Sequence, residues 1–435
     1  MSNIFRRHCD TLENGLRVVT LETPHLHSAL AAVHVRAGSR HETPRTNGVT
    51  HFLEHVLFRG SENFPDSLAA SALVEDAGGS LNGMTLRDQC AFDTPIHPTR
   101  LELALRVLGD MVSRPLFLGV ELEREIILEE MMDEVDSEGR DIDAGNRMMK
   151  LIYGGHPLGM KVAGTTDTVK ALTEGDLKDH HARRFNGSSA VVTVAGPVHR
   201  EEVVPLAAEC FSGLPKGQLP EESAPVLLPM GPRLDLLDLD ESQTDLCISF
   251  PCPPETHPDH PALAMIRAIL DDSLTSRLQR EIVETRGLAY SIRAGMELFC
   301  DAGTFDIDAS CTPAKVLALT DAVLSLLGSL ASVPVPQEEL DRVLARRRIA
   351  LDFHADDLTT LLNCLGAMEL FRPPETFEDS LAALGRVTPT QLLDAARRTF
   401  TQDQLHLCAV GPKAGRLKKQ LFACAKKHLP ARSAP

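Results

Sequence analysis

Two segments of the chain repeat each other. Residues 172–197 (LTEGDLKDHHARRFNGSSAVVTVAGP) and 387–412 (VTPTQLLDAARRTFTQDQLHLCAVGP) align without a gap at an offset of 215, and seven of the 26 positions are identical. Each copy predicts a helix capped by Thr173 or Thr388, a short polar turn and an apolar strand that ends in Gly-Pro. The duplication predicts two homologous domains of about 215 residues each.

A proline-rich segment separates the two copies. Residues 213–233 contain five prolines, which remove backbone donors and favour an extended backbone, so we expect a tether there. The predicted division is a first domain at 1–212, a linker at 213–233 and a second domain at 234–435.

We expect both domains to be α+β, each a mainly antiparallel sheet backed by helices. In the first domain, strands are predicted at 15–22 and 29–37, paired with each other, and at 190–195. Helices are predicted at 49–58, 101–112 and 121–135. Because these helices do not alternate regularly with single strands, a doubly wound parallel sheet is disfavoured.

Charge and composition argue against several classes of protein. The chain has 44 Lys+Arg, 61 Asp+Glu and no Trp, with a net charge of −17, which disfavours a nucleic-acid partner. No stretch reaches the ~20 uninterrupted apolar residues of a membrane-spanning helix, and no secretory signal is visible. Ten scattered cysteines without a CxxC pair predict a reduced chain in the cytoplasm.

His51, Glu54 and His55 form an HxxEH pattern on the helix predicted at 49–58. Histidines four residues apart share one face of a helix and can hold one metal ion. The opposite face is an apolar stripe that we expect to pack on the sheet: Val49, Phe52, Leu53, Val56 and Leu57. Two solvated histidines would give the same pattern, so the metal hypothesis needs a third ligand.

The third ligand is expected on the helix predicted at 121–135. A carboxylate commonly complements two imidazoles at a catalytic zinc site, where a fourth position stays open. Glu123 and Glu130 lie on the stripe that carries Ile126 and Ile127, whereas Glu129 lies on a separate acidic side. A carboxylate in an apolar stripe is costly unless it is paired or metal-bound. This favours Glu130 or Glu123, and not Glu129.

The order HxxEH reverses the HExxH of thermolysin-like enzymes and is the inverzincin signature. Other matching segments are AGSR at 37–40, FRGS at 58–61, GGSLN at 78–82, EREIILEE at 123–130, HPLG at 156–159 and RGLAYS at 286–291. Together these segments resemble the pitrilysin family of zinc metallopeptidases, which includes the mitochondrial processing peptidase and its bacterial relatives.

The resemblance implies a role for each matching residue of the first domain. His51, His55 and Glu130 would bind Zn²⁺, and Glu54 would be the general base that activates a water molecule. Glu123 would orient a histidine ligand. The corresponding helix of the second domain, at 263–271, carries no His or Glu, so one zinc ion per chain is expected.

The resemblance also implies residues that contact the substrate. Tyr290 would act from the second domain, where it would stabilise the oxyanion or hold the peptide backbone. Asn82 and Thr85 lie on a strand whose edge would pair with the peptide, and Arg286 is a further candidate for substrate binding.

Two positions depart from the family pattern. Val283 stands where an Arg commonly lies seven residues before the closing Tyr, so half of an Arg/Tyr clamp is missing, and Arg280 and Arg286 are the nearby candidates to replace it. Gly83 stands where relatives more often carry Ala, which would loosen the substrate-binding strand.

The leading hypothesis is a zinc endopeptidase that cleaves short or unfolded peptides inside a closed chamber. Family chambers contain four such domains, so a chain with two implies a homodimer, or a heterodimer with a related chain that supplies the Arg/Tyr clamp. A dedicated processing protease for one precursor or leader peptide is a second form of this hypothesis. The alternative is a non-hydrolytic structural or regulatory subunit of a larger assembly.

Overall fold

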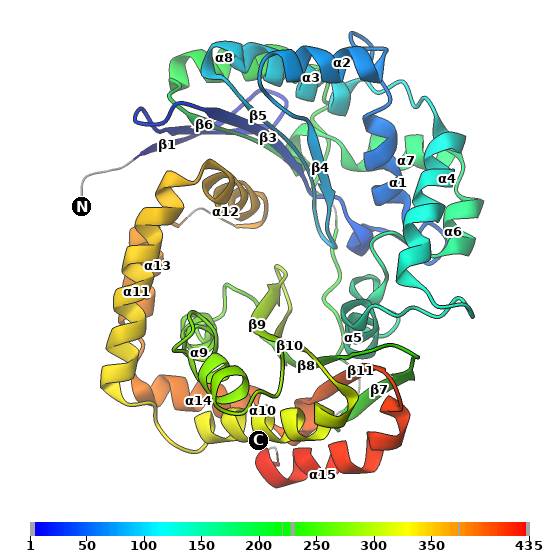
Figure 1. Ribbon diagram of the computed structural model, residues 1–435. Helices are drawn as coiled ribbons and strands as arrows, with labels where there is room; N and C mark the ends of the chain where they lie inside the picture. The colour runs from blue at the N-terminus through cyan, green and yellow to red at the C-terminus, as the bar shows by residue number, and fades with distance from the viewer. Residues whose placement is uncertain (1–4, 220, 228–230, 373–374, 432–435) are drawn as a thin grey trace. The chain divides into compact units, whose positions relative to one another are not determined.

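The structure, a computed structural model, describes residues 5–219, 221–227, 231–372 and 375–431. It divides into two units, each built around one sheet (Figure 1). The first unit comprises Met1–Asp133, Met160–Ser223 and Ala350–Pro374. The second comprises Glu134–Gly159, Ala224–Ile349 and Glu375–Pro435.

The first unit has a six-stranded sheet in the order β1-β2-β6-β3-β5-β4, antiparallel except for the parallel pair β2–β6. The strands are β1 (Arg6–Thr11), β2 (Arg17–Glu22), β3 (Ala29–Val35), β4 (Asn82–Thr85), β5 (Cys90–Ile96) and β6 (Ala190–Gly196). The helices are α1 (Val49–Leu57), α2 (Ser67–Asp76), α3 (Leu101–Ser113), α4 (Val120–Glu130), α6 (Thr166–Ala171), α7 (Glu174–Arg184), α8 (Arg200–Cys210) and α12 (Leu358–Phe371).

The second unit has a five-stranded sheet in the order β7-β11-β8-β10-β9, with β7–β11 as its parallel pair. The strands are β7 (Arg233–Asp238), β8 (Thr244–Cys252), β9 (Ser291–Leu298), β10 (Gly303–Cys311) and β11 (His406–Gly411). The helices are α5 (Ala144–Tyr153), α9 (His260–Leu270), α10 (Val316–Leu330), α11 (Gln337–Asp356, which continues into the first unit at Ala350), α13 (Phe377–Gly385), α14 (Pro389–Thr399) and α15 (Lys418–His428).

The duplication and the α+β fold class are confirmed. The helices α7 and α14 begin 215 residues apart, as do β3 and β8, and as do α3 and α10. Thr173 and Thr388 each cap their helix through a capping box, in which the cap hydroxyl and the side chain three residues later bind each other's backbone N–H. The two sheets have the same strand order from the parallel pair onward.

The predicted pairing of the strands at 15–22 and 29–37 is wrong. Strand β6 lies between β2 and β3, parallel to the first and antiparallel to the second. All seven residues of β6 are buried, and a strand buried on both faces normally lies in the interior of a sheet with a neighbour on each side.

The helix α12 covers one face of the first sheet, while α3 and α8 lie on the other face (Figure 1). Leu362 of α12 packs with Leu30 of β3, whose alternate side chains point to this face. Glu369 of α12 is buried and forms ion pairs with Arg7 (2.6 Å) on β1 and Arg17 (3.1 Å) on β2.

The helix α5 takes the corresponding place on the second sheet. Met148, Met149 and Tyr153 of α5 are buried in one cluster with Leu237 of β7 and Cys408 of β11. Each half of the sequence therefore contributes one helix to the unit formed mostly by the other half. The domain division at 212 and 234 does not describe these exchanged segments, because an apolar helix face carries no sign of which sheet it covers.

The linker has no helix or strand at 215–219 or 221–227, while residues 220 and 228–230 lie outside the description. Glu222 ties the linker to the first unit, because its carboxylate contacts Arg36 (2.7 Å) and His41 (3.1 Å) and is largely buried. The predicted linker ends one residue late, since β7 begins at Arg233.

Within the part of the chain that the structure describes, one helical stretch, Pro313–Leu330, is long and apolar enough to cross a membrane by length and composition. Half of it is buried inside the protein, where Leu319, Val323 and Leu327 belong to the core of the second unit. This packing is that of a core helix.

Gly366 of α12 lies directly over the ring of His34 in β3, too close for any added Cβ atom. We expect Gly366→Ala to destabilise the first unit by about 1–3 kcal/mol, although Ala normally stabilises a helix by about 1 kcal/mol relative to Gly. Gly385→Ala in α13 is the matched control, since its nearest neighbour is Leu344 Cδ2 at 3.6 Å. Thermal unfolding measures both variants, and an unchanged midpoint for Gly366→Ala would contradict the close packing.

Candidate metal centre

The start of helix α1 is fixed by a buried carboxylate. Gly48 precedes the helix with φ +92°, and a Cβ atom there would lie 2.6 Å from the carbonyl oxygen of Ala163. Glu42 accepts hydrogen bonds from the backbone N–H of Gly48 (2.7 Å) and Thr50 (2.9 Å) and from the Asn47 side chain (3.0 Å). These N–H groups have no partner inside the helix, and the carboxylate satisfies them where no side chain of the cap residue does.

Helix α1 has the two faces that its sequence predicts. The stripe residues Val49, Phe52, Leu53, Val56 and Leu57 are at most 1 % exposed and lie in the core of the first unit. The HxxEH residues, on the other face, are only partly buried.

The side chains of His51, His55 and Glu130 converge. One ligand atom from each lies within 4.8 Å of the others, and this His–His–Glu group is the one such group found among the described residues. The two imidazole rings are 4.7 Å apart, and His55 Nε2 lies 3.7 Å from Glu130 Oε2. The structure thus brings together the three residues proposed as ligands.

The donor set of this group fits zinc. Two nitrogens and one carboxylate oxygen are common protein ligands of a catalytic zinc site. Burial, together with the neighbouring His55, lowers the pKa of His51 to about 4, so its imidazole is neutral, as a ligand must be. Nδ1 of His51 is buried and has no hydrogen-bond partner among the described residues. Tetrahedral ligands lie roughly 3.4 Å apart, so the group needs to close only a little, and Glu130 is exposed enough to move.

Glu123 lies behind His55, where the resemblance puts a supporting glutamate. Its Oε2 is 2.9 Å from His55 Nδ1, and its Oε1 is bound by Arg59 Nε. The side chain of Glu123 is only 5 % exposed. A carboxylate at this place keeps the proton of His55 on Nδ1 and leaves Nε2 free toward the His–His–Glu group.

The prediction for the face of α4 is partly wrong. Its buried positions are Val120, Glu123 and Ile127, whereas Ile126 is 37 % exposed and the Glu130 side chain 56 % exposed. Glu130 is the last residue of the helix, and its side chain is exposed although the next residue, Met131, is buried in the core.

Glu54 is oriented by the neighbouring strand β4. Thr85 Oγ1 donates a hydrogen bond of 2.7 Å to Glu54 Oε2. Burial raises the pKa of Glu54, and the bond from Thr85 opposes that shift. Gly83 leaves the room for this side chain, since a Cβ atom there would lie 2.6 Å from Glu54 Oε1 and 2.7 Å from Phe58 Cε2. The sequence showed Gly83 only as a residue that loosens the strand.

The predicted substrate contacts of β4 have partners within the protein. Asn82 donates from Nδ2 to Asp93 Oδ2 of β5 at 2.9 Å, and the hydroxyl of Thr85 is engaged by Glu54. The strand lies at the edge of the sheet and pairs with β5 on one side only among the described residues. Its other edge is free to pair with an extended chain.

The predicted residues of the second unit, Tyr290 and Arg286, lie between the helical segment Gln279–Thr285 and β9. The Tyr290 side chain is 91 % exposed, and Arg286 lies 3.9 Å from Glu281 in an ion pair. Val283 packs against the core of the second unit, so the position of the missing clamp residue is filled by an apolar contact.

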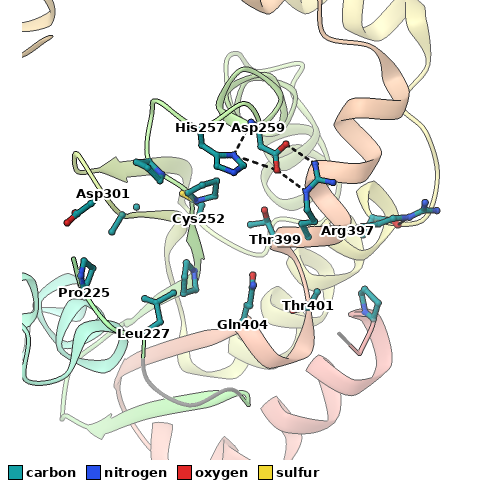
Figure 2. A pocket seen from close by; sticks show the side chains of 18 of the residues that line it. Pro225, Leu227, Cys252, His257, Asp259, Asp301, Arg397, Thr399, Thr401 and Gln404 are labelled. Carbon is teal, nitrogen blue, oxygen red and sulfur yellow. Dashed lines mark hydrogen bonds and ion pairs between the residues drawn. The ribbon is translucent and has the colours of Figure 1, made fainter. Parts of the chain in front are cut away.

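A separate cavity of about 670 Å³ lies in the second unit. Figure 2 shows that its lining includes Cys252, His257 and Asp259. Burial raises the pKa of Cys252 to about 12, which keeps the thiol protonated and unreactive. Asp259 is held by Arg398 through two bonds of 2.8 Å. The cavity therefore shows no activated nucleophile.

Two family models match the chain. Residues 17–166 match insulinase, peptidase family M16, and residues 171–347 match the peptidase M16 inactive domain. An uncharacterized zinc protease of Mycobacterium leprae is 32% identical over 421 residues, which cover 94% of this chain and 93% of the relative. The chain belongs to peptidase family M16.

A second relative and a solved structure are also similar to this chain. A probable mitochondrial-processing peptidase subunit beta of Schizosaccharomyces pombe is 27% identical over 424 residues, which cover 94% of this chain and 92% of that protein. A protease from Helicobacter pylori has the same fold, with a TM-score of 0.87 at 21% identity over 94% of this chain and 100% of that one. The family resemblance inferred from the sequence motifs is confirmed. The metal group lies within the segment matched by the insulinase model.

We expect Glu42→Gln to destabilise the M16 chain by about 1–3 kcal/mol, because an amide N–H₂ would face backbone N–H groups that need an acceptor. Thermal unfolding without added metal isolates this effect from metal binding. Glu75→Gln on α2 is the matched control, since Glu75 is exposed. Equal unfolding midpoints for the two variants would show that Glu42 does not fix the start of α1.

Proposed function

We propose that the chain is a zinc-dependent endopeptidase that cleaves short or unfolded peptides. The observation that carries the proposal is the convergence of His51, His55 and Glu130 within 4.8 Å, with Glu54 on the same helix as the two histidines. Membership of peptidase family M16 and a relative named a zinc protease support it.

Each residue of the site has a task in this reaction. His51, His55 and Glu130 hold the ion, at one ion per chain. A bound zinc ion supplies Lewis acidity, which polarises a peptide carbonyl and makes a water molecule acidic near neutral pH. Glu54 takes a proton from the attacking water and passes it to the leaving amine.

The free edge of β4 is the proposed place for the substrate backbone. A peptide added to this edge would gain main-chain hydrogen bonds, which give affinity with little sequence preference. Met84 and Leu86, 42 % and 38 % exposed, offer apolar contacts beside that edge. This arrangement favours extended, unfolded peptides over folded proteins. Tyr290 and Arg286 remain proposed substrate contacts from the second unit.

A partner chain is part of the proposal. The Schizosaccharomyces pombe relative is named a subunit, and Val283 leaves this chain without one clamp residue. We propose a homodimer, or a heterodimer whose second chain supplies an Arg/Tyr clamp. In the heterodimer, processing of one precursor or leader peptide is a natural specialisation. A reducing cytoplasm is the proposed location, because the ten cysteines of the sequence are scattered and form no CxxC pair.

A non-hydrolytic subunit is the alternative. The match of residues 171–347 to an M16 inactive domain keeps this alternative in view. The His–His–Glu group and Glu54 favour the enzyme, because a purely structural subunit has no need for two imidazoles and two carboxylates at one spot.

We expect Glu54→Gln to retain one zinc ion per chain and to lower peptide hydrolysis by about 10²–10⁴-fold, the usual loss on removing a general base. His51→Ala should lose the metal as well as the activity. Metal analysis and mass spectrometry of a peptide mixture, with and without chelator, measure both properties. Undiminished hydrolysis by Glu54→Gln would remove Glu54 from the mechanism, and wild-type protein that binds zinc but cleaves no peptide would favour the alternative.

Although relatives more often carry Ala at this position, we expect Gly83→Ala to lower kcat here while zinc binding is retained, because the new methyl group would displace the Glu54 and Phe58 side chains of this chain. Misplacement of a reacting group by about 1 Å can cost on the order of 10²-fold. Gly295→Ala in β9 is the matched control for a Gly→Ala change in a strand, since no atom lies within 4 Å of its added Cβ. Full activity of Gly83→Ala would show that Glu54 does not need the position seen here.

A further inference from the structure

Arg59 lies one helical turn beyond His55, just after the end of α1. Its Nε–H is bound to Oε1 of Glu123, while Oε2 of the same carboxylate faces His55 Nδ1 at 2.9 Å. The two oxygens of Glu123 therefore serve two different partners, and the carboxylate bridges Arg59 and His55.

The surroundings hold this arrangement in place. The Glu123 side chain is 5 % exposed, and a buried carboxylate is costly unless charged partners and hydrogen bonds compensate it. The aliphatic part of Arg59 lies over Gly119, since a Cβ atom there would be 3.4 Å from Arg59 Cγ and 3.5 Å from Cδ. Gly119 has φ +67° and immediately precedes α4, the helix that carries Glu123. The aliphatic part of the Arg59 side chain thus packs against the backbone that leads into α4.

We propose that Arg59 is a positioning residue for the metal ligand His55 and that it acts through Glu123. The proposal rests on the zinc site proposed above. By binding Oε1, the guanidinium fixes the plane of the carboxylate so that Oε2 faces His55 Nδ1. The imidazole then keeps its proton on Nδ1 and presents Nε2 toward Glu130 and His51. Arg59 touches neither the ion nor the substrate in this role.

A guanidinium and an ammonium differ in what they can do here. Lysine would supply the same charge next to Glu123 but a mobile, rotatable donor in place of the planar fork of arginine. A residue that only neutralises the buried carboxylate could be replaced by lysine. A residue that sets the plane of the carboxylate could not.

The test measures zinc affinity of the full chain by competition with a chelator, together with the visible spectrum of the Co²⁺-substituted protein. Loss of a residue that bonds a metal ligand costs about 10–100-fold in metal affinity, and Arg59 is one step further from the ion, so we expect Arg59→Gln to weaken zinc binding by about 10-fold. Arg59→Lys should recover only part of the loss, and both variants should alter the Co²⁺ spectrum. Arg106→Gln is the matched control, because Arg106 pairs with Glu102 and Glu209 on the surface of the same unit.

A double-mutant cycle with Glu123→Gln tests whether Arg59 acts through Glu123. We expect the variant that carries both Arg59→Gln and Glu123→Gln to bind zinc no more weakly than Glu123→Gln alone. Wild-type affinity in Arg59→Lys, or losses that add in the double variant, would overturn the positioning role. If Arg59→Gln does not fold, the lysine variant still decides between charge and orientation. Wild-type protein that binds no zinc would instead overturn the proposed function itself.

Discussion

The first unit depends on how helix α1 is held between the sheet and α4. The apolar stripe of α1 fixes which face is buried, and Glu42 binds the N–H groups of its first turn. Glu123 of the neighbouring helix α4 then binds the Nδ1 atom of His55. These contacts fix the position, rotation and side-chain orientation of the helix. The HxxEH side chains lie close together because the apolar face of α1 is packed in the core, so the helix cannot rotate.

The sequence was sufficient to predict those features of the fold and the site that repeat or are periodic. The offset of 215 residues identified the duplicated α+β fold, since the capping threonines and the Gly-Pro ends recur in both copies. The spacing of Val49, Phe52 and Val56 identified the buried face of α1. The family motifs indicated Glu130 and Glu123 as residues of the metal site, and the structure places both carboxylates near His55. Each of these features leaves a local or regular trace in the sequence.

Contacts between distant segments could not be predicted in the same way. The insertion of β6 between β2 and β3, and the packing of α5 and α12 on sheets formed by the other half of the chain, leave no periodic trace. The bonds from Thr85 to Glu54 and from Arg59 to Glu123 depend on side chains that meet only in the folded unit. Gly83 shows the difference best, because its small size matters only beside Glu54. The exposure of Glu130 was missed because the helical pattern placed it on one stripe with Ile126 and Ile127, whereas the buried positions of α4 are Val120, Glu123 and Ile127.

The central claim is that two imidazoles and one carboxylate share a single zinc ion. Crystals of the full chain grown with zinc, measured on both sides of the zinc absorption edge, would locate the ion by its anomalous scattering. The account predicts one strong peak per chain, within about 2.2 Å of a nitrogen of His51, a nitrogen of His55 and an oxygen of Glu130. No peak at this place, or a peak bound by other residues, would contradict it.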